Sequence, residues 1–281
     1  MRDQAQNLRD TFTAAKNKGS IYCISSGKGG VGKSGITINL GICLAKSGSK
    51  VAIIDADIGL SNLEILIGKV SIYNFSDCLN RGIPFEKATV EGPCGLKILS
   101  GGSGIAEVSA LDEERFSAFI ELLKNLKKDY DYILIDTGAG ISNNVTKFAG
   151  IADEVIVVTT CEPTALADAY ALIKLLFTKE ISDKISVITN RAENKKDGET
   201  TFKNLNAVTK KFLNKELKYL GLVSDDKEFV RAVKAQKPII IYNENSKASK
   251  NIFSISKNIL GNETSKTSEY GFIAKIRKIF A

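Results

Sequence analysis

The sequence predicts an α/β fold in which a mostly parallel, twisted sheet carries helices on both faces. Short, almost continuously apolar runs alternate with longer stretches in which apolar residues recur at helical spacing. Strands that are apolar throughout are typical of parallel sheets that are buried on both faces. The chain has 281 residues, 43% of them hydrophobic and 25% charged, so it can bury a core that needs no disulfide bonds.

We expect the strands and helices to alternate along one domain, residues 20–260. The expected strands are residues 21–25, 51–55, 96–99, 132–136, 155–159, 185–190 and 219–223. The expected helices are residues 34–46, 112–128, 164–177, 201–213 and 226–235. Two segments flank this domain. Residues 1–19 precede it, and a polar spacer, residues 261–270, leads to a short terminal stretch, residues 271–281.

The composition excludes several common catalytic chemistries. The chain contains no histidine, which is the commonest general base and the commonest metal ligand. Ser-His-Asp and Cys-His catalysis are therefore excluded. The cysteines never occur in a CxxC spacing, which argues against a zinc knuckle or an iron–sulfur cluster within one chain. They are Cys23, Cys43, Cys78, Cys94 and Cys161, and this odd, scattered set predicts a reduced, cytosolic environment.

The formal net charge is +7, and most of the basic excess lies in the C-terminal half. Such a region indicates a nucleic acid partner, an anionic membrane surface or simply a solvated lysine-rich surface. No run of 18 apolar residues occurs, and the first ten residues are polar. We therefore expect neither a transmembrane span nor a signal peptide, and a cytoplasmic protein.

A glycine-rich stretch directly follows the first expected strand and precedes the first expected helix. It matches GxxxxGK[ST] in the context that a phosphate-binding loop requires, so a P-loop NTPase fold is predicted. Glycines let backbone N–H groups close around phosphate oxygens, and the helix N-terminus adds partial positive charge. Lys33 would contact the β- and γ-phosphates, and Ser34 would bind Mg²⁺. The loop comprises Gly27, Lys28, Gly29, Gly30, Val31, Gly32, Lys33 and Ser34.

Acidic residues follow two other expected strands. Asp55 ends the strand at residues 51–55, Asp57 follows two positions later, and Asp136 ends the strand at residues 132–136. The carboxyl ends of parallel strands meet at one edge of the sheet, where the phosphate loop also lies. These acids are therefore placed to hold Mg²⁺ through water. Without histidine, hydrolysis must depend on positioning and charge stabilisation, and a carboxylate such as Asp57 can orient the attacking water.

The loop contains a second lysine, Lys28, and the stretch KGGVGKS resembles the deviant phosphate loop of the MinD/ParA ATPases. The resemblance continues through residues 51–65, 131–141 and 188–192, and it spans about residues 20–260. In that family ATP lies between two subunits. The resemblance implies an Mg²⁺-dependent ATPase that forms a homodimer when ATP is bound.

The resemblance also implies roles for individual residues. Lys28 would reach the partner subunit's phosphates, and Asp57 would orient water. Asp55 and Asp136 would hold the Mg²⁺ shell together with Ser34. These roles all concern the phosphate end of ATP.

Other matching positions concern the rest of the nucleotide. Asn190 and Arg191 resemble the position that reads adenine. Residues 220–238 resemble the segment that closes over the base, with Ser224 where proline is common. One loop position departs from the pattern, because Gly35 stands where the family usually has a second hydroxyl that contacts the α-phosphate.

The N-terminal segment contains DQAxxLR, which resembles the activator motif of flagellar MinD-like ATPases of the FlhG/FleN type. In that group the motif stimulates FlhF, a GTPase of the signal-recognition-particle kind. Ala5, Leu8 and Phe12 would share one face of a short amphipathic helix. The resemblance therefore implies an FlhF-type partner, bound through Asp3, Gln4, Ala5, Leu8 and Arg9.

The C-terminal stretch has the pattern of an amphipathic helix. Its bulky apolar residues fall within an arc of about 120° at helical spacing, opposite three cations. This arrangement is typical of helices that lie on an anionic bilayer, and it resembles the membrane-targeting helices of MinD-type proteins. The alternative is a helix docked on its own domain, and one helix can do both in different nucleotide states. The apolar residues are Phe272, Ile273, Ile276, Ile279 and Phe280.

Together these features predict a cytoplasmic ATPase that binds reversibly to the inner face of the cell membrane and regulates flagellar number or placement. Flagellar switch or regulatory proteins are further candidate partners. One alternative is a division-site MinD, against which the DQAxxLR segment argues. Another is a ParA-like DNA segregation ATPase, which surface lysines between residues 195 and 218 would suit, although no DNA-reading motif accompanies them. Metal-cluster carriers share the loop but need suitably placed cysteines.

Overall fold

An eight-stranded sheet forms the centre of the computed structural model, which describes residues 19–57, 63–101, 112–261, 272 and 275–276. The strand order is β3-β4-β2-β5-β1-β6-β7-β8, and every neighbouring pair is parallel except β3 with β4. The predicted α/β class and mostly parallel sheet are confirmed. The strands are β1 (Ser20–Ser26), β2 (Val51–Ala56), β3 (Thr89–Glu91), β4 (Lys97–Leu99), β5 (Tyr132–Ala139), β6 (Glu154–Thr160), β7 (Ile185–Ala192) and β8 (Lys218–Ser224).

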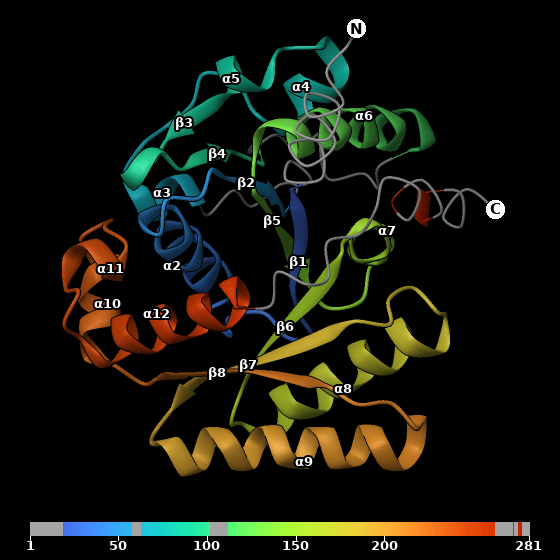
Figure 1. Ribbon diagram of the computed structural model, residues 1–281, viewed down its shortest axis with the longest axis vertical. Coiled ribbons are helices and arrows are strands. Elements are labelled where there is room, and N and C mark those ends of the chain that lie inside the picture. The colour runs from blue at the N-terminus through green and yellow to red at the C-terminus, as the bar shows by residue number, and fades with distance from the viewer. Residues whose placement is uncertain (1–18, 58–62, 102–111, 262–271, 273–274, 277–281) are drawn as a thin grey trace, which may run out of the picture.

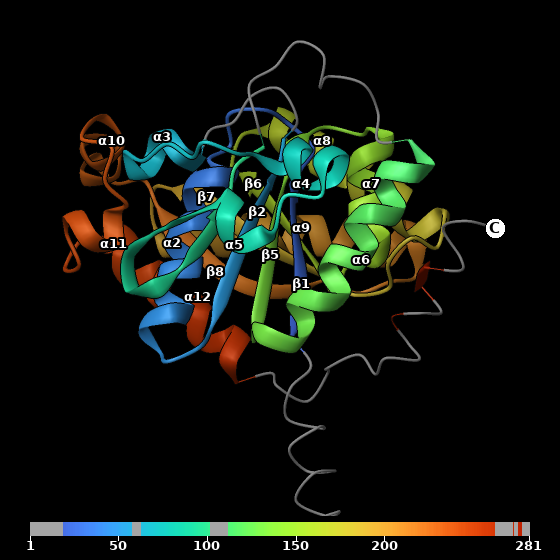
Figure 2. The same cartoon turned by 90° about the horizontal axis from the view of Figure 1, so that it is seen from above.

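Helices cover both faces of the sheet (Figures 1 and 2). Helices α6 to α9 lie on one side of the strands, and α2 and α10 to α12 lie on the other. The helices are α2 (Lys33–Lys46), α3 (Leu63–Ile67), α4 (Phe75–Arg81), α5 (Phe85–Ala88), α6 (Glu113–Asp129), α7 (Asn143–Ile151), α8 (Pro163–Thr178), α9 (Lys195–Leu213), α10 (Lys227–Lys234), α11 (Ile239–Tyr242) and α12 (Lys247–Leu260), with a 3₁₀ turn at Pro93–Gly95.

Each face of the sheet has its own apolar core. Under α4, α6 and α7, the ring of Phe119 meets Phe75 and Phe148 edge to face, with centroids 5.2 and 5.3 Å apart. Edge-to-face contacts of this kind add to the stabilisation that apolar burial provides. On the other face, α2 and α12 pack together and cover the strands with buried isoleucines and leucines. The central strand β1, between β5 and β6, is buried throughout.

The structure corrects several predicted boundaries. Asp112 and Asp226 are caps rather than first helical residues, because their carboxylates accept hydrogen bonds from the backbone N–H groups of Arg115 and Glu228. Helix α9 begins at Lys195 and not at residue 201, because Asn194 caps it. The first six residues of α9, KKDGET, include no apolar side chain, so a search for apolar residues at helical spacing does not detect where the helix begins.

Some elements were not predicted from the sequence at all. Helix α12 is the clearest omission, since its buried residues Ala248, Ile252, Ile255 and Ile259 have the spacing of an amphipathic helix. Helix α7 and the short strand β3 are also additions. Within the described part of the chain, no helix combines the length and apolar character needed to cross a membrane.

We expect Phe119→Ala to lower the free energy of unfolding by about 3–5 kcal/mol, because it removes a fully buried ring that joins three helices. Urea denaturation followed by circular dichroism measures this change. The control is Phe253→Ala on α12, where the ring is 41% exposed. Equal losses in the two variants would contradict this account of the core.

Candidate functional site

The glycine-rich loop joins the end of β1 to the start of α2, as the motif predicts. Gly32 caps α2 with φ at 90°, a left-handed conformation that favours glycine. A Cβ atom on Gly27 would lie 2.2 Å from the backbone carbonyl of Asp168 in α8. The loop therefore requires glycine at one position for its backbone angle and at another for close packing.

A buried ion pair joins this loop to β5. The Lys33 ammonium lies 3.0 Å from Asp136 Oδ1, and both side chains are almost fully buried. The Thr37 hydroxyl lies 2.9 Å from the same carboxylate oxygen and 3.0 Å from the Lys33 carbonyl. One hydroxyl hydrogen can serve only one of these acceptors at a time. Thr37 was missed in the sequence analysis, although a hydroxyl one turn beyond the GK[ST] lysine was the available signal.

Two further carboxylates, Asp55 and Asp57, lie at the carboxyl end of β2, at the same edge of the sheet. Asp55 Oδ1 accepts a hydrogen bond from the Asp57 N–H at 3.1 Å. Burial, and then the nearby charge of Asp136, raises the pKa of Asp55 to about 7. Burial also raises the pKa of Asp57, and the charge of Lys33 opposes that rise. The structure therefore brings Asp55 and Asp136 together, as the strand positions predicted.

This group of carboxylates suits a divalent cation. The second oxygen of Asp136, Oδ2, is buried and has no hydrogen-bond partner among the described residues. A cation would supply that missing partner and would also reduce the repulsion between Asp55 and Asp136. Hard oxygen ligands of this kind are those that Mg²⁺ prefers.

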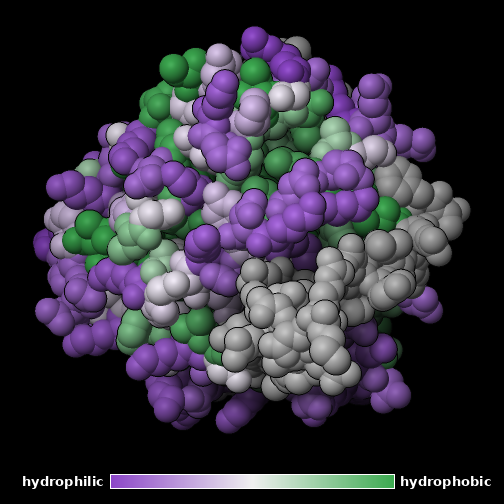
Figure 3. Space-filling model, turned by 45° about the horizontal axis from the view of Figure 1, so that its top comes forward, coloured by the Kyte–Doolittle hydropathy of each residue, from purple (hydrophilic) through white to green (hydrophobic). Residues whose placement is uncertain are grey.

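A cleft of about 880 Å³ opens beside the loop. Its lining includes Gly29 to Gly35, Asp57 and Arg191. The phosphate loop, the residue expected to orient water and one of the two residues expected to read adenine therefore face the same cleft. Ile65 and Val233 also line it and are 58% and 42% exposed. Figure 3 shows one face of the molecule, on which hydrophobic side chains form separate groups among hydrophilic ones.

The additional lysine does not join the buried pair. The Lys28 ammonium donates to the Thr164 hydroxyl at 2.9 Å and lies 3.3 Å from a Glu162 oxygen, both at the start of α8. Lys28 and Glu162 are both partly exposed. Glu162 and Thr164 were not identified from the sequence, and no motif points to them.

The two residues at the expected adenine position behave differently. Asn190 is buried, and its side-chain amide donates to the Val31 carbonyl at 2.7 Å, so it braces the phosphate loop. Arg191 is exposed, has φ at 54° and lines the cleft. In this structure, Arg191 is therefore the accessible member of the pair.

Gly35, which replaces the family's usual hydroxyl residue, packs closely against a neighbouring helix. A Cβ atom there would lie 3.1 Å from two ring carbons of Phe229 in α10, which is a tight contact. Phe229 belongs to the segment, residues 220–238, that was expected to close over the base. Glycine at this position lets α10 lie close to the start of α2.

The terminal segments are described only in part. The residues expected to bind the GTPase, Asp3 to Arg9, lie outside the described residues, as do Ile273, Ile279 and Phe280. Phe272 is described, and it is buried at 3% exposure. Ile276 is partly buried against the same core cluster. In this structure these two residues contact the chain's own domain, which is the docked alternative.

Comparison with known proteins gives consistent matches. A family model described as "ParA: NUBPL iron-transfer P-loop NTPase" matches residues 17–260. The antiactivator FleN of Pseudomonas aeruginosa is 33% identical over 229 residues, which cover 82% of this chain and 82% of FleN. The flagellum site-determining protein YlxH of Helicobacter pylori is 35% identical over 244 residues, which cover 84% of this chain and 80% of YlxH.

A solved structure leads to the same conclusion. The septum site-determining protein MinD of Pyrococcus horikoshii, solved as a complex with Mg-ADP, superposes with a TM-score of 0.69 at 26% sequence identity. The match covers 88% of this chain and 99% of that protein. Sequence and fold comparisons therefore point to one group of nucleotide-binding proteins.

We expect the pH dependence of stability to report the environment of Asp55. In the folded chain its pKa is about 7 against an ordinary 3.8, so between these values the native state holds a proton that the unfolded chain releases. The free energy of unfolding should therefore lose this contribution as pH rises toward 7. Asp55→Asn cannot ionise and should remove the loss.

Urea unfolding of the wild type and Asp55→Asn, without Mg²⁺ or nucleotide, tests this at pH 5 and pH 8. The variant should gain stability relative to the wild type at the higher pH. If the free energies of unfolding of the variant and the wild type differed equally at both pH values, the raised pKa of Asp55 would be contradicted.

Proposed function

The chain belongs to the ParA family of P-loop NTPases, in its MinD-like FlhG/FleN branch, and is an ATPase; from this we propose that it is an ATP-driven switch that controls flagellar number or placement. The observation that carries the proposal is the deviant phosphate loop joined to a buried lysine–carboxylate pair. The names of FleN and YlxH supply the flagellar context.

In this proposal the cleft binds ATP with Mg²⁺. Backbone N–H groups of the loop and Lys33 hold the phosphates, and Ser34, Asp55 and Asp136 hold the ion. Bound Mg²⁺ would neutralise charge that develops on the phosphates. The Asp136 oxygen that has no partner among the described residues supports this assignment, as does the Mg-ADP bound to the MinD of Pyrococcus horikoshii.

Asp57 is the residue that we assign to the attacking water. It faces the cleft, and its pKa is raised, which favours a hydrogen bond to water at the reacting centre. A Cβ atom on Gly138 would lie 3.1 Å from Asp57 Oδ1, so glycine leaves room for this carboxylate. The chain thus performs hydrolysis by orienting water and balancing charge, without a histidine.

Homodimer formation would complete the site. Lys28 is held by Glu162 and Thr164 and makes no ion pair with the buried carboxylates of its own site, which supports a contact with the partner subunit's phosphates. The exposed Ile65 and Val233 at the cleft would be buried between two copies. Because ATP then binds the dimer more tightly than the monomer, ATP favours dimerisation by the same free energy.

The two terminal segments carry the proposed outputs. Residues 271–281 would attach the ATP-bound dimer to an anionic membrane at the inner face of the cell membrane, and hydrolysis would reverse this. Residues 1–19 would stimulate an FlhF-type GTPase. On α9, Lys195 and Lys210 pair with Glu199 and Glu216, which interrupts a basic patch and disfavours nucleic acid as the partner.

We expect Asp57→Ala to accumulate as an ATP-bound dimer, because water is no longer oriented for hydrolysis. Lys28→Ala should stay monomeric with ATP, because the contact with the partner subunit's phosphates is lost. Light scattering after size-exclusion chromatography, with ATP and Mg²⁺, measures both. Identical behaviour of the two variants would refute the dimer switch.

A peptide of residues 1–20 should accelerate GTP hydrolysis by a cognate FlhF-type GTPase, because the activator motif lies within it. A peptide with Leu8 and Arg9 both changed to alanine is the control. If the natural peptide does not accelerate GTP hydrolysis, the result favours a division-site or DNA-segregation function over the flagellar one.

A further inference from the structure

The start of the ATPase domain and the C-terminal stretch meet at one buried carboxylate, that of Asp153. Its Oδ2 accepts hydrogen bonds from the Ile21 N–H at 2.9 Å and from the Lys127 ammonium at 3.0 Å. Its Oδ1 has no hydrogen-bond partner in the described part of the chain and lies 3.7 Å from the Lys275 ammonium. Ile21 lies at the amino end of β1, and Lys275 belongs to the C-terminal stretch. One side chain therefore contacts both.

The first described residues are held tightly at this place. The Gly19 N–H donates to the Lys127 carbonyl at 3.0 Å, and the Asp153 N–H donates to the Ile21 carbonyl at 2.7 Å. A Cβ atom on Gly19 would lie 2.2 Å from the Tyr130 carbonyl oxygen. The point at which the N-terminal segment leaves the domain is thus defined by the end of α6 and by Asp153.

Phe272 and Lys275 lie over the same group of charges. The Lys127 ammonium lies 5.0 Å from the centroid of the Phe272 ring, a cation–π contact. The Lys275 ammonium donates to the Ala152 carbonyl. Phe272 and Lys275 therefore exclude water from the Lys127–Asp153 pair, and a pair in a drier environment is stronger.

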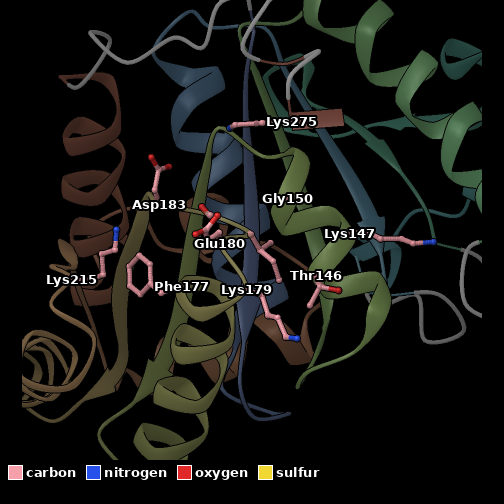
Figure 4. A pocket seen from close by; sticks show the side chains of 11 residues that line it. Thr146, Lys147, Gly150, Phe177, Lys179, Glu180, Asp183, Lys215 and Lys275 are labelled. Atoms are coloured by element: carbon pink, nitrogen blue, oxygen red, sulfur yellow. The ribbon is translucent and has the colours of Figure 1, made fainter. Parts of the chain in front are cut away.

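The covering is incomplete, because the Lys275 side chain stays 30% exposed. Burial lowers the pKa of Lys275 and outweighs the opposing influence of Asp153, so the ammonium is costly to hold there. Lys275 also lines a cavity of about 600 Å³ between α7 and the end of α8. Figure 4 shows Lys275 apart from Lys147 and Lys179, which line the same cavity. Asp153 is the carboxylate that pairs with Lys275.

We infer that Asp153 couples the two terminal segments, so that release of the C-terminal stretch loosens the anchor from which the N-terminal segment extends. When Phe272 and Lys275 leave, water reaches Asp153 and Lys127, and the bonds that hold residues 19–21 weaken. The link between the two segments stands on these contacts. That the release occurs on a lipid surface rests on the proposed function.

The coupling gives the membrane a role in partner recognition. Linkage is reciprocal, so a protein that binds the loosened N-terminal segment favours release of the C-terminal stretch by the same free energy. The form of the chain attached to a lipid surface is then the form that engages its GTPase partner most readily.

Amide hydrogen exchange of the full-length chain tests this inference. The variants Lys275→Gln and Phe272→Ala should raise the exchange rates at Gly19, Ser20 and Ile21 about five-fold or more, the lower end of typical coupling energies. Lys179→Gln is the matched control, because it removes the same charge from the lining of the same cavity without a contact to Asp153. Wild-type rates at residues 19–21 in both test variants would overturn the inference.

A second arm uses the wild-type chain with ATP, Mg²⁺ and vesicles of phosphatidylglycerol and phosphatidylcholine. Chains that sediment with the vesicles should show the same faster exchange at residues 19–21. Sedimentation without faster exchange would also overturn the inference. Failure to sediment would count against the proposed membrane attachment, and the variants would still decide the coupling.

Discussion

The buried pair between Lys33 and Asp136 is the interaction on which the site depends. Two opposite charges without water are tolerated only as partners, and removing one leaves the other at a cost of about 3–5 kcal/mol. The pair fixes the start of α2 against β5 and leaves one Asp136 oxygen without a hydrogen-bond partner among the residues that the structure describes. That oxygen, next to the protonation-prone Asp55, makes a cation with a phosphate ligand the natural complement of the site.

Strand β1 connects this site to the opposite edge of the sheet. Its carboxyl end continues into the phosphate loop, and its amino end is held by Asp153, which also pairs with Lys275. Seven residues of strand span about 20 Å. The phosphate loop and Asp153 therefore lie at the two ends of one fully buried strand.

The sequence was sufficient where local pattern and chemistry coincide. Apolar strands, the loop motif and the aspartates at strand ends predicted the sheet and the placement of Lys33, Asp55 and Asp136. It was insufficient where a residue acts through a neighbour distant in sequence. Nothing local shows that Asn190 braces the loop, that Phe229 fills the space beside Gly35, or that Asp153 gathers both chain ends. Helix α12 could have been predicted from its apolar spacing.

A single fluorescent residue gives the most direct test of the link between nucleotide and terminal stretch. The chain contains no tryptophan, so Phe272→Trp introduces one reporter at the covered site. In an Asp57→Ala background, ATP with Mg²⁺ should shift its emission to longer wavelength as the ring enters water, and in a Lys28→Ala background it should not. Emission that ATP leaves unchanged in both backgrounds would contradict the account.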